Sequence, residues 1–455
     1  MRTAAKELFV NAFYCASPSQ SWTGLWAHPR STGLRYNEIG FWTDLARSCE
    51  DGLLDGIFLA DTLGVSDVYQ GSAAAILRAG GFVPSMDPML VIPLMAAATR
   101  QLTFGITGNI SYETPYLLAR RLSTLDHLSC GRVAWNVVTG VLESTSRAVG
   151  LTAMRAHDER YKVADEYIAL MYKLWEKSWD DDAAVRDPVR RVFTEPSRVR
   201  AIDHDGEYFR CKGIHLSEPS PQRTPVIFSA GASASGVEFI AKHAECAFIS
   251  GGDKRFVANV VQQIRRKAVA YGRLPTDIKI FLGATIVTGR TNAEARDRLH
   301  EYGAYCDGQG NLAFHSGNMG LDFSKFALDD PIPKVKTNAS QTKIDAMTAE
   351  PDRVLRVGDL AKFAPIVGRD TFMVGSAVEI CDEILDWVRE TDIDGLNLLR
   401  TVEPESLKSF CDLVIPELQN RGAFKEKYRD GPLREKLFPG SNGRLGERHP
   451  AKKPD

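Results

Sequence analysis

Long apolar runs are absent from this chain of 455 residues. An apolar stretch at residues 87–98 is interrupted by Pro93 and is shorter than the ~18 residues that a membrane span requires. The N-terminus has no signal-peptide core, so we expect a cytoplasmic protein with no membrane segment. An excess of either charge is also missing, since 56 Lys and Arg face 58 Asp and Glu. This balance leaves no broad basic field, so no nucleic-acid partner is expected.

Motifs that bind metals or form disulfides are missing as well. The eight cysteines lie far apart with no C-x-x-C among them, which is typical of reduced thiols in the cytosol. Nothing matches H-E-x-x-H, and the nine histidines form no ligand-spaced cluster, so no metal site is expected. No G-x-G-x-x-G follows a predicted strand, and no G-x-x-x-x-G-K-[ST] occurs. The chain therefore has no recognisable NAD fingerprint or P-loop of its own.

What the chain does have is an alternation of short apolar runs with longer amphipathic stretches. The runs show no clean in–out alternation, as is typical of parallel strands that are buried on both faces. Eight such β/α repeats predict a TIM (β/α)8 barrel, with a doubly wound open sheet as the alternative. The predicted strands are residues 8–13, 56–60, 102–107, 132–138, 225–229, 247–250, 279–287 and 395–399, and the main helices are 41–50, 116–128, 158–173 and 405–418.

The length exceeds what such a barrel needs. A core of about 250 residues leaves roughly 200 for additions. Residues 64–88, 178–221 and 303–359 do not fit the repeat and are predicted to be insertions, which in barrels build substrate sites and lids at the carboxyl ends of strands. We therefore expect one decorated barrel domain over residues 1–420. Residues 421–455 are rich in Gly, Pro and charge, and are expected to form an extended tail that wraps a neighbouring subunit.

One segment has the composition of an oxyanion site. The fifth predicted strand continues into Ser229-Ala-Gly-Ala-Ser-Ala-Ser-Gly236, whose small residues let backbone N–H groups approach an anion at a helix N-terminus. Ser233 and Ser235 are placed either to cap that helix or to donate to a phosphate. The same segment lacks the last glycine of a G-x-S-x-G nucleophile elbow, which disfavours serine hydrolysis.

Two further groups of polar residues lie where a barrel would place a ligand. His157 and Tyr161 are four residues apart at the start of a predicted helix, so they share a face that can hold an anion or a flat ring. The acidic residues between them also suit a helix N-terminus without any ligand. Asp61, Thr107 and Asn136 lie at or near the ends of three predicted strands. A buried Asn136 needs a hydrogen-bond partner, which is either backbone and water or a ligand.

At these residues the chain resembles the bacterial-luciferase-like flavin monooxygenases. The resemblance is specific to the branch that contains nitrilotriacetate, dibenzothiophene-sulfone, dimethyl-sulfide and long-chain-alkane monooxygenases. Its motifs span roughly residues 10–438 in matching order. The most specific motifs are Ser123-Thr-Leu-Asp-His-Leu128, Ala134-Trp-Asn-Val-Val-Thr139 and His157-Asp-Glu-Arg-Tyr161.

The resemblance implies a TIM barrel that binds reduced FMN (FMNH2), supplied by a separate NAD(P)H:flavin reductase. It also implies that O2 reacts with the flavin to give a C4a-(hydro)peroxyflavin, which then oxygenates the substrate. Relatives of this branch assemble as dimers or tetramers, so a homodimer or homotetramer is expected. Carried over by position, the cofactor-binding residues are Asp61, Thr107, Asn136, His157, Tyr161, Ser229, Ala232 and Ser233.

The chain departs from the family pattern in two places. The family's usual Gln-Ala-Gly at the fifth strand is Ser229-Ala-Gly231 here, which shortens a side chain at the flavin edge. Relatives that hydroxylate alkanes carry Cys, His, Tyr and His where this chain has Ser17, Gln20, Ser66 and Val141. The expected pocket is therefore poorer in acid–base groups, which argues against long-chain alkane hydroxylation.

Apolar residues near the mouth favour a small hydrophobic or aromatic substrate. We expect C–S cleavage of an organosulfur compound or oxidative dehalogenation of a halogenated or heteroaromatic xenobiotic. The alternatives are an alkane hydroxylase, and a barrel that binds F420 or flavin without oxygenase activity. His315 in the last insertion is either a partner of the substrate or a solvated loop residue. The predicted catalytic candidates are His315, Gln20 and Tyr69, and the predicted substrate-binding residues are Phe13, Ser17, Trp22, Ser66, Val141 and Phe314.

Overall fold

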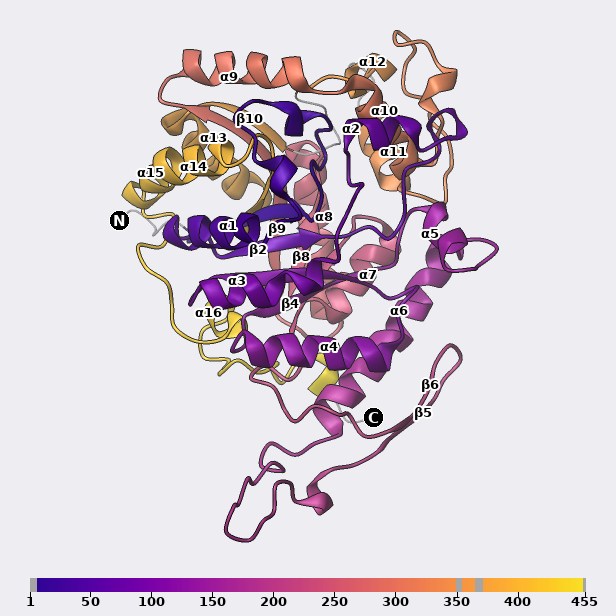
Figure 1. The fold of residues 1–455 in the computed structure, drawn as a ribbon, viewed down its shortest axis with the longest axis vertical. Coiled ribbons are helices and arrows are strands. Elements are labelled where there is room, and N and C mark those ends of the chain that lie inside the picture. Colours follow the sequence, from indigo (N-terminus) through magenta and orange to yellow (C-terminus); the bar gives the residue numbers. More distant parts are fainter. Residues whose placement is uncertain (1–5, 349–353, 365–370, 453–455) are drawn as a thin grey trace.

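A computed structural model describes residues 6–348, 354–364 and 371–452. Parallel strands close into a barrel in the order β1, β2, β3, β4, β7, β8, β9, β11 and back to β1 (Figure 1). The predicted TIM barrel is confirmed, and each predicted strand overlaps one strand of the barrel. The strands are β1 (Phe9–Cys15), β2 (Gly56–Ala60), β3 (Thr103–Asn109), β4 (Val133–Val138), β7 (Val226–Ala230), β8 (Cys246–Ile249), β9 (Lys279–Gly289) and β11 (Gly395–Leu399).

Helices surround the barrel, and many of them pack one apolar face on the strands (Figure 1). In α8, for example, Val257, Val260, Val261 and Ile264 are buried at helical spacing. The helices are α1 (Ile39–Asp51), α2 (Ala74–Ala79), α3 (Ile92–Ala98), α4 (Pro115–Leu128), α5 (Glu143–Ala148), α6 (His157–Tyr172), α7 (Ala234–His243), α8 (Lys254–Ala270), α9 (Asn292–Tyr305), α10 (Gly308–Met319), α11 (Gln341–Met347), α12 (Val357–Leu360), α13 (Ala377–Thr391), α14 (Glu405–Ser409), α15 (Ile415–Asn420) and α16 (Leu433–Leu437).

The inside of the barrel is a packed core rather than a channel. Side chains alternate between the two faces of each strand, so Phe9, Asn11 and Phe13 of β1 point inward. Inward phenylalanines from five strands contact one another, with ring centroids 5.2–6.3 Å apart. Between them, the Asn11 side-chain amide donates to Asn397 Oδ1 at 3.1 Å. This filling leaves room for a ligand only at the ends of the barrel.

The C-terminal residues differ from the extended tail that the sequence suggested. Their described part folds back onto this chain and includes the short helix α16. Leu433 and Leu437 of α16 pack against the inward phenylalanines at the amino ends of the strands. Arg434 lies fully buried beside Glu245, which explains why a segment with so many charges is not extended in solvent.

The three predicted insertions have different structures. Residues 64–88 contain α2, and residues 178–221 form an arm with an antiparallel hairpin, β5 (Ile202–Asp205) and β6 (Arg210–Gly213), that projects from the barrel (Figure 1). Residues 303–359, expected only to be an insertion, contain the almost completely buried helix α10. A further strand that the sequence did not predict, β10 (Thr371–Ser376), pairs with the second half of β9.

Among the described helices, none is long and apolar enough to span a bilayer. Within residues 6–348, 354–364 and 371–452, no group of three or more His, Cys, Asp or Glu is placed to hold a metal ion.

Candidate active site

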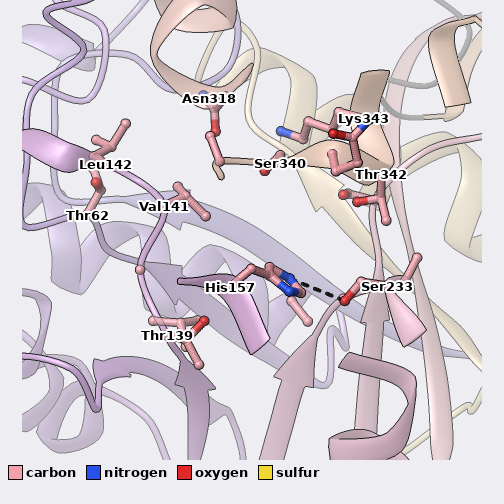
Figure 2. A pocket seen from close by; sticks show the side chains of 18 of the residues that line it. Thr62, Thr139, Val141, Leu142, His157, Ser233, Asn318, Ser340, Thr342 and Lys343 are labelled. Atoms are coloured by element: carbon pink, nitrogen blue, oxygen red, sulfur yellow. Dashed lines mark hydrogen bonds between the residues drawn. The ribbon is translucent and has the colours of Figure 1, made fainter. Parts of the chain in front are cut away.

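A cavity of about 900 Å³ lies at the carboxyl ends of the barrel strands, the face on which TIM-barrel sites are built. Strand ends and the loops that follow β2 and β4 form its floor and one side, and the starts of α6 and α7 form another. Residues 337–346, which we call the roof, cover it from above. Figure 2 shows Ser340, Thr342 and Lys343 of the roof above His157 and Ser233, with Val141 and Leu142 to one side.

One end of the cavity is built for an anion. Ser233 is the N-cap of α7, and its Oγ accepts the N–H of Gly236 at 3.1 Å. His157, the first residue of α6, brings its Nε2 to 3.5 Å from Ser233 Oγ (Figure 2). Burial raises the pKa of Tyr161, so its hydroxyl stays protonated and can donate. Two helix N-termini and the side chains of Ser233, His157 and Tyr161 therefore meet at one point, an arrangement that favours a phosphate.

Small residues keep this end open. A Cβ added at Gly236 would lie 2.9 Å from the Tyr161 hydroxyl oxygen, and one at Gly231 would lie 3.4 Å from it. Any larger residue at Gly236 would therefore fill the space beside Ser233. The small residues between Ser229 and Gly236 therefore line a concave part of the cavity wall, and they also include the N-cap of α7.

The strand ends present polar groups to the middle of the cavity. Asp61, at the end of β2, accepts the N–H of Thr62 at 2.8 Å, and burial raises its pKa to about 6. Asn109, the last residue of β3, also lines the cavity. Thr107 and Asn136 do not: Asn136 Nδ2 donates to Thr107 Oγ1 at 2.9 Å inside the barrel. The Oδ1 of Asn136 has no hydrogen-bond partner among the described residues.

The other end of the cavity is apolar. Phe82 and Phe314 stack with ring centroids 5.3 Å apart and an interplanar angle of 7°. Leu63, Val141 and Leu142 line the space beside them. Polar side chains of the roof complete this end, so the cavity offers an apolar body and a few polar contacts, which is the usual character of a small-molecule site.

The structure brings ten of the predicted site residues to the cavity wall: Phe13, Asp61, Ser66, Val141, His157, Tyr161, Ser229, Ala232, Ser233 and Phe314. Seven others do not line the cavity as the described residues define it: Ser17, Gln20, Trp22, Tyr69, Thr107, Asn136 and His315.

The three catalytic candidates, His315, Gln20 and Tyr69, lie outside the cavity wall, and their catalytic roles stay predictions. Tyr69 and Trp22 belong to a second hydrophobic cluster between α10 and the loop after β1, and Trp22 donates to Thr285 Oγ1 at 3.2 Å. His315 is 1% exposed on α10, with its ring against Phe314. Gln20 is also 1% exposed, and its amide has no hydrogen-bond partner among the described residues. Of residues 20–22 in the loop after β1, only Ser21 lines the cavity, whereas Gln20 and Trp22 are buried beside it in the chain.

Ser17, a predicted substrate contact, does not line the cavity. It is completely buried, and its Oγ donates to the carbonyl of Ser19 at 2.8 Å.

Sequence reasoning also missed part of the cavity wall, including Asn109, Thr139, Arg160, Ser250, Asn318, Ser340, Thr342 and Lys343. For Asn109 a signal existed, because it follows Thr107 by two residues on the same face of a strand that was predicted to end too early.

Comparison with known proteins agrees with this geometry. The sequence profile of the luciferase-like monooxygenase family matches residues 21–394. The chain belongs to this family. Dimethyl-sulfide monooxygenase of Hyphomicrobium sulfonivorans is 43% identical over 98% of this chain and 93% of its own length. Long-chain alkane monooxygenase of Geobacillus thermodenitrificans is 41% identical over 98% of this chain and 97% of its own length.

Solved structures of family members superpose closely. The crystal structure of long-chain alkane monooxygenase has a TM-score of 0.91 and covers 98% of this chain and 99% of its own. A riboflavin lyase, crystallised with modified FMN and the substrate riboflavin, is 35% identical with a TM-score of 0.91, and the match covers 98% of this chain and 99% of that one. The resemblance inferred from the motifs is thus confirmed, both for the family and for the branch.

Proposed function

We propose that this chain is the oxygenase component of a two-component monooxygenase. A separate NAD(P)H:flavin reductase supplies FMNH2 by diffusion, and the chain uses it with O2 to oxygenate a small hydrophobic or aromatic molecule. Bound FMNH2 supplies two electrons and the atom with which O2 reacts. One observation carries the proposal: a single cavity joins an anion site at two helix starts to an apolar end beside a stacked aromatic pair.

The chemistry of the cavity fits FMN. Its phosphate matches the donors Ser233 Oγ, His157 and the Tyr161 hydroxyl, and the space that a Cβ at Gly236 would fill. The flavin ring matches the wider region between the strand ends, where Asp61 and neighbouring polar groups can orient it. The riboflavin lyase that was crystallised with modified FMN supports the same cofactor for this chain.

The protein's own part in the reaction is to bind, orient and exclude water. Ser233 and His157 would hold the phosphate, and Asp61 would orient the ring. Val141, Leu142 and the roof restrict solvent at the reacting edge, which protects a reduced flavin from wasteful oxidation. His315, Gln20 and Tyr69 lie outside the cavity wall, so we assign them no proton transfer.

An organosulfur compound is the substrate class that we favour, ahead of a halogenated or heteroaromatic compound and of a linear alkane. One relative is named for dimethyl sulfide and another for long-chain alkanes. Ser66 and Val141 line the cavity where alkane-hydroxylating relatives carry Tyr and His, which supports the sulfur compound over the alkane. In each case one atom of O2 enters the substrate, and the other leaves as water with the two electrons of FMNH2.

The proposal is tested with the purified chain, FMN, NADH and a generic flavin reductase under 18O2. Sulfides, sulfones, halogenated phenols and linear alkanes are offered separately, and products are analysed by mass spectrometry. We expect 18O in the product of at least one sulfur compound, with little peroxide released. Peroxide alone with every substrate would contradict the oxygenase function and favour a flavin- or F420-binding barrel, whereas 18O only in alkanols would overturn the substrate class.

The same proposal includes a homodimer or homotetramer in solution. Light scattering on the purified chain measures the mass directly, and a monodisperse monomer would contradict it.

A further inference from the structure

The helix that carries His157 and Tyr161 begins without a capping side chain of its own. Its N-cap is Ala156, which has no side-chain acceptor for the N–H groups of the first turn. These groups have no partner inside the helix and are usually satisfied by a Ser, Thr, Asp or Asn at the cap. An acceptor for α6 must therefore come from elsewhere in the fold.

Asn338, 181 residues further along the chain, supplies that acceptor. Its Oδ1 accepts the N–H of His157 at 3.0 Å, and its Nδ2 donates to the carbonyl of Arg155 at 3.5 Å. Its own backbone carbonyl accepts Arg160 Nη2 at 2.9 Å. Three hydrogen bonds thus join one residue to the start of α6.

Asn338 belongs to the roof but does not line the cavity. Its neighbours Thr337 and Ala339 do, so any movement of Asn338 moves the cavity wall. Arg160, which is almost completely buried, donates to Gly140 in the loop after β4 as well as to Asn338. The hydrogen bonds of Asn338 and Arg160 therefore connect the roof, the loop after β4 and the first turn of α6.

The first turn of α6 in turn meets the start of α7. His157 Nε2 lies 3.5 Å from Ser233 Oγ, and Ser235 Oγ donates to Asp158 Oδ1 at 2.7 Å. A small change in the first turn of α6 would alter the distance between His157 and Ser233. The first turn of α6 thus contacts both the roof and the anion end of the cavity.

We infer that Asn338 is a positioning residue that links closure of the roof to binding of the flavin phosphate. The inference rests on the proposed FMN site. When the roof lies over the cavity, Asn338 caps α6 and holds His157 towards Ser233. By thermodynamic linkage, a phosphate held by these two residues then stabilises the closed roof to the same extent.

The test compares FMN with riboflavin, which has the same ring and no phosphate. Oxidised FMN and riboflavin are titrated against wild type and Asn338→Ala by flavin fluorescence, with competition to verify a shared site. Loss of a helix cap predicts about fivefold weaker FMN binding and unchanged riboflavin binding. Amide hydrogen exchange in residues 157–161 should accelerate in Asn338→Ala and lose its protection by FMN.

Val335→Ala is the matched control, because Val335 is exposed in the segment leading to the roof and its side chain carries no polar group. It should leave both affinities unchanged. If Asn338→Ala proves unstable, Asn338→Ser, which keeps a shorter acceptor, should show a smaller loss for FMN alone. Equal weakening of FMN and riboflavin, or an unchanged FMN affinity, would overturn the inference. A wild type that binds FMN no more tightly than riboflavin would instead contradict the proposed phosphate site.

Discussion

The two ends of the barrel each contain a buried arginine, and the two arginines have different partners. At the amino end, Arg434 is 1% exposed and donates to both carboxylate oxygens of Glu245 at 2.6 and 2.9 Å. It also donates to the carbonyls of Thr224 and Gly443 at 2.8 and 2.7 Å. At the carboxyl end, Arg160 is equally buried but donates to carbonyls and a thioether, with no carboxylate partner among the described residues.

This difference indicates that the amino end of the barrel serves stability, whereas the carboxyl end is arranged to bind a ligand. Buried charges are normally paired, and Arg434 with Glu245 obeys that rule while α16 closes the barrel. At the carboxyl end Arg160 lines the cavity, and its Nε has no hydrogen-bond partner within the described residues. The charge of Arg160 thus has no carboxylate counter-ion among the described residues, and a bound anionic cofactor would supply negative charge beside it.

The largest effect on stability is expected from removing the ion pair of Arg434 with Glu245 at the amino end of the barrel. Arg434→Ala should lower the free energy of unfolding by about 3–5 kcal/mol, because Glu245 remains buried without a counter-ion. Urea denaturation followed by circular dichroism measures the change. The double variant Arg434→Met, Glu245→Leu should recover most of the loss, since an apolar pair replaces the ion pair. A loss below about 1 kcal/mol for Arg434→Ala would contradict the structural role.

At the carboxyl end of the barrel, the second-largest effect is a pH dependence of the folding stability that comes from Asp61. Burial raises the pKa of Asp61 from 3.8 to about 6, so the folded state binds this proton more tightly than the unfolded state. Stability from this group is therefore present at low pH and is lost as pH rises from about 4 to 6. Asp61→Asn should stabilise the flavin-free protein at pH 8 by up to about 3 kcal/mol, and the gain should vanish near pH 4. A stability difference that does not change with pH would contradict this assignment.

The anion end should lose affinity with only a small loss of stability. Ser233→Ala removes a donor to the phosphate, which predicts about tenfold weaker FMN binding. The lost N-cap of α7 should cost only about 1 kcal/mol of folding stability. Fluorescence titration and thermal unfolding measure the two effects separately. An unchanged dissociation constant for FMN would contradict a phosphate site at the starts of α6 and α7.

The smallest effect is expected at the apolar end. Val141 is 37% exposed, so Val141→Ala should change stability by less than about 0.5 kcal/mol. The same change should raise the KM of a hydrophobic substrate about threefold, because two methyl groups leave the wall of the cavity. Steady-state kinetics with the reductase present provide the measurement. If KM stays constant for every substrate class, this end of the cavity does not hold the substrate.

The sequence predicted the repeating part of the fold because each strand of a parallel barrel is a buried apolar run. All the barrel strands were found in that way, and so were the helices α1, α4 and α6, whereas the long helices α8, α9 and α13 were not located. It failed for β10 and α10. Strand β10 pairs only with the second half of β9. Helix α10 is buried on all sides, so it lacks the one-sided apolar pattern that marks a surface helix.

For the candidate site, too, local sequence patterns were sufficient for some residues and insufficient for others. Asp61, His157 and Ser233 follow directly from strand and helix ends, and they reach the cavity. Thr107 and Asn136 bond to each other because an inward polar pair at neighbouring positions satisfies itself first. The roof could not be predicted, since its position depends on contacts such as that of Asn338 with His157, 181 residues apart.

The most direct test is a crystal structure of the protein with FMN bound. The phosphate should lie within hydrogen-bond distance of Ser233 Oγ at the starts of α6 and α7, with the flavin ring over Asp61 and Asn109 and its reacting edge towards Phe82 and Phe314. Density for FMN at another place on the chain, or a phosphate that points towards the aromatic pair, would contradict the assignment of the two ends of the cavity.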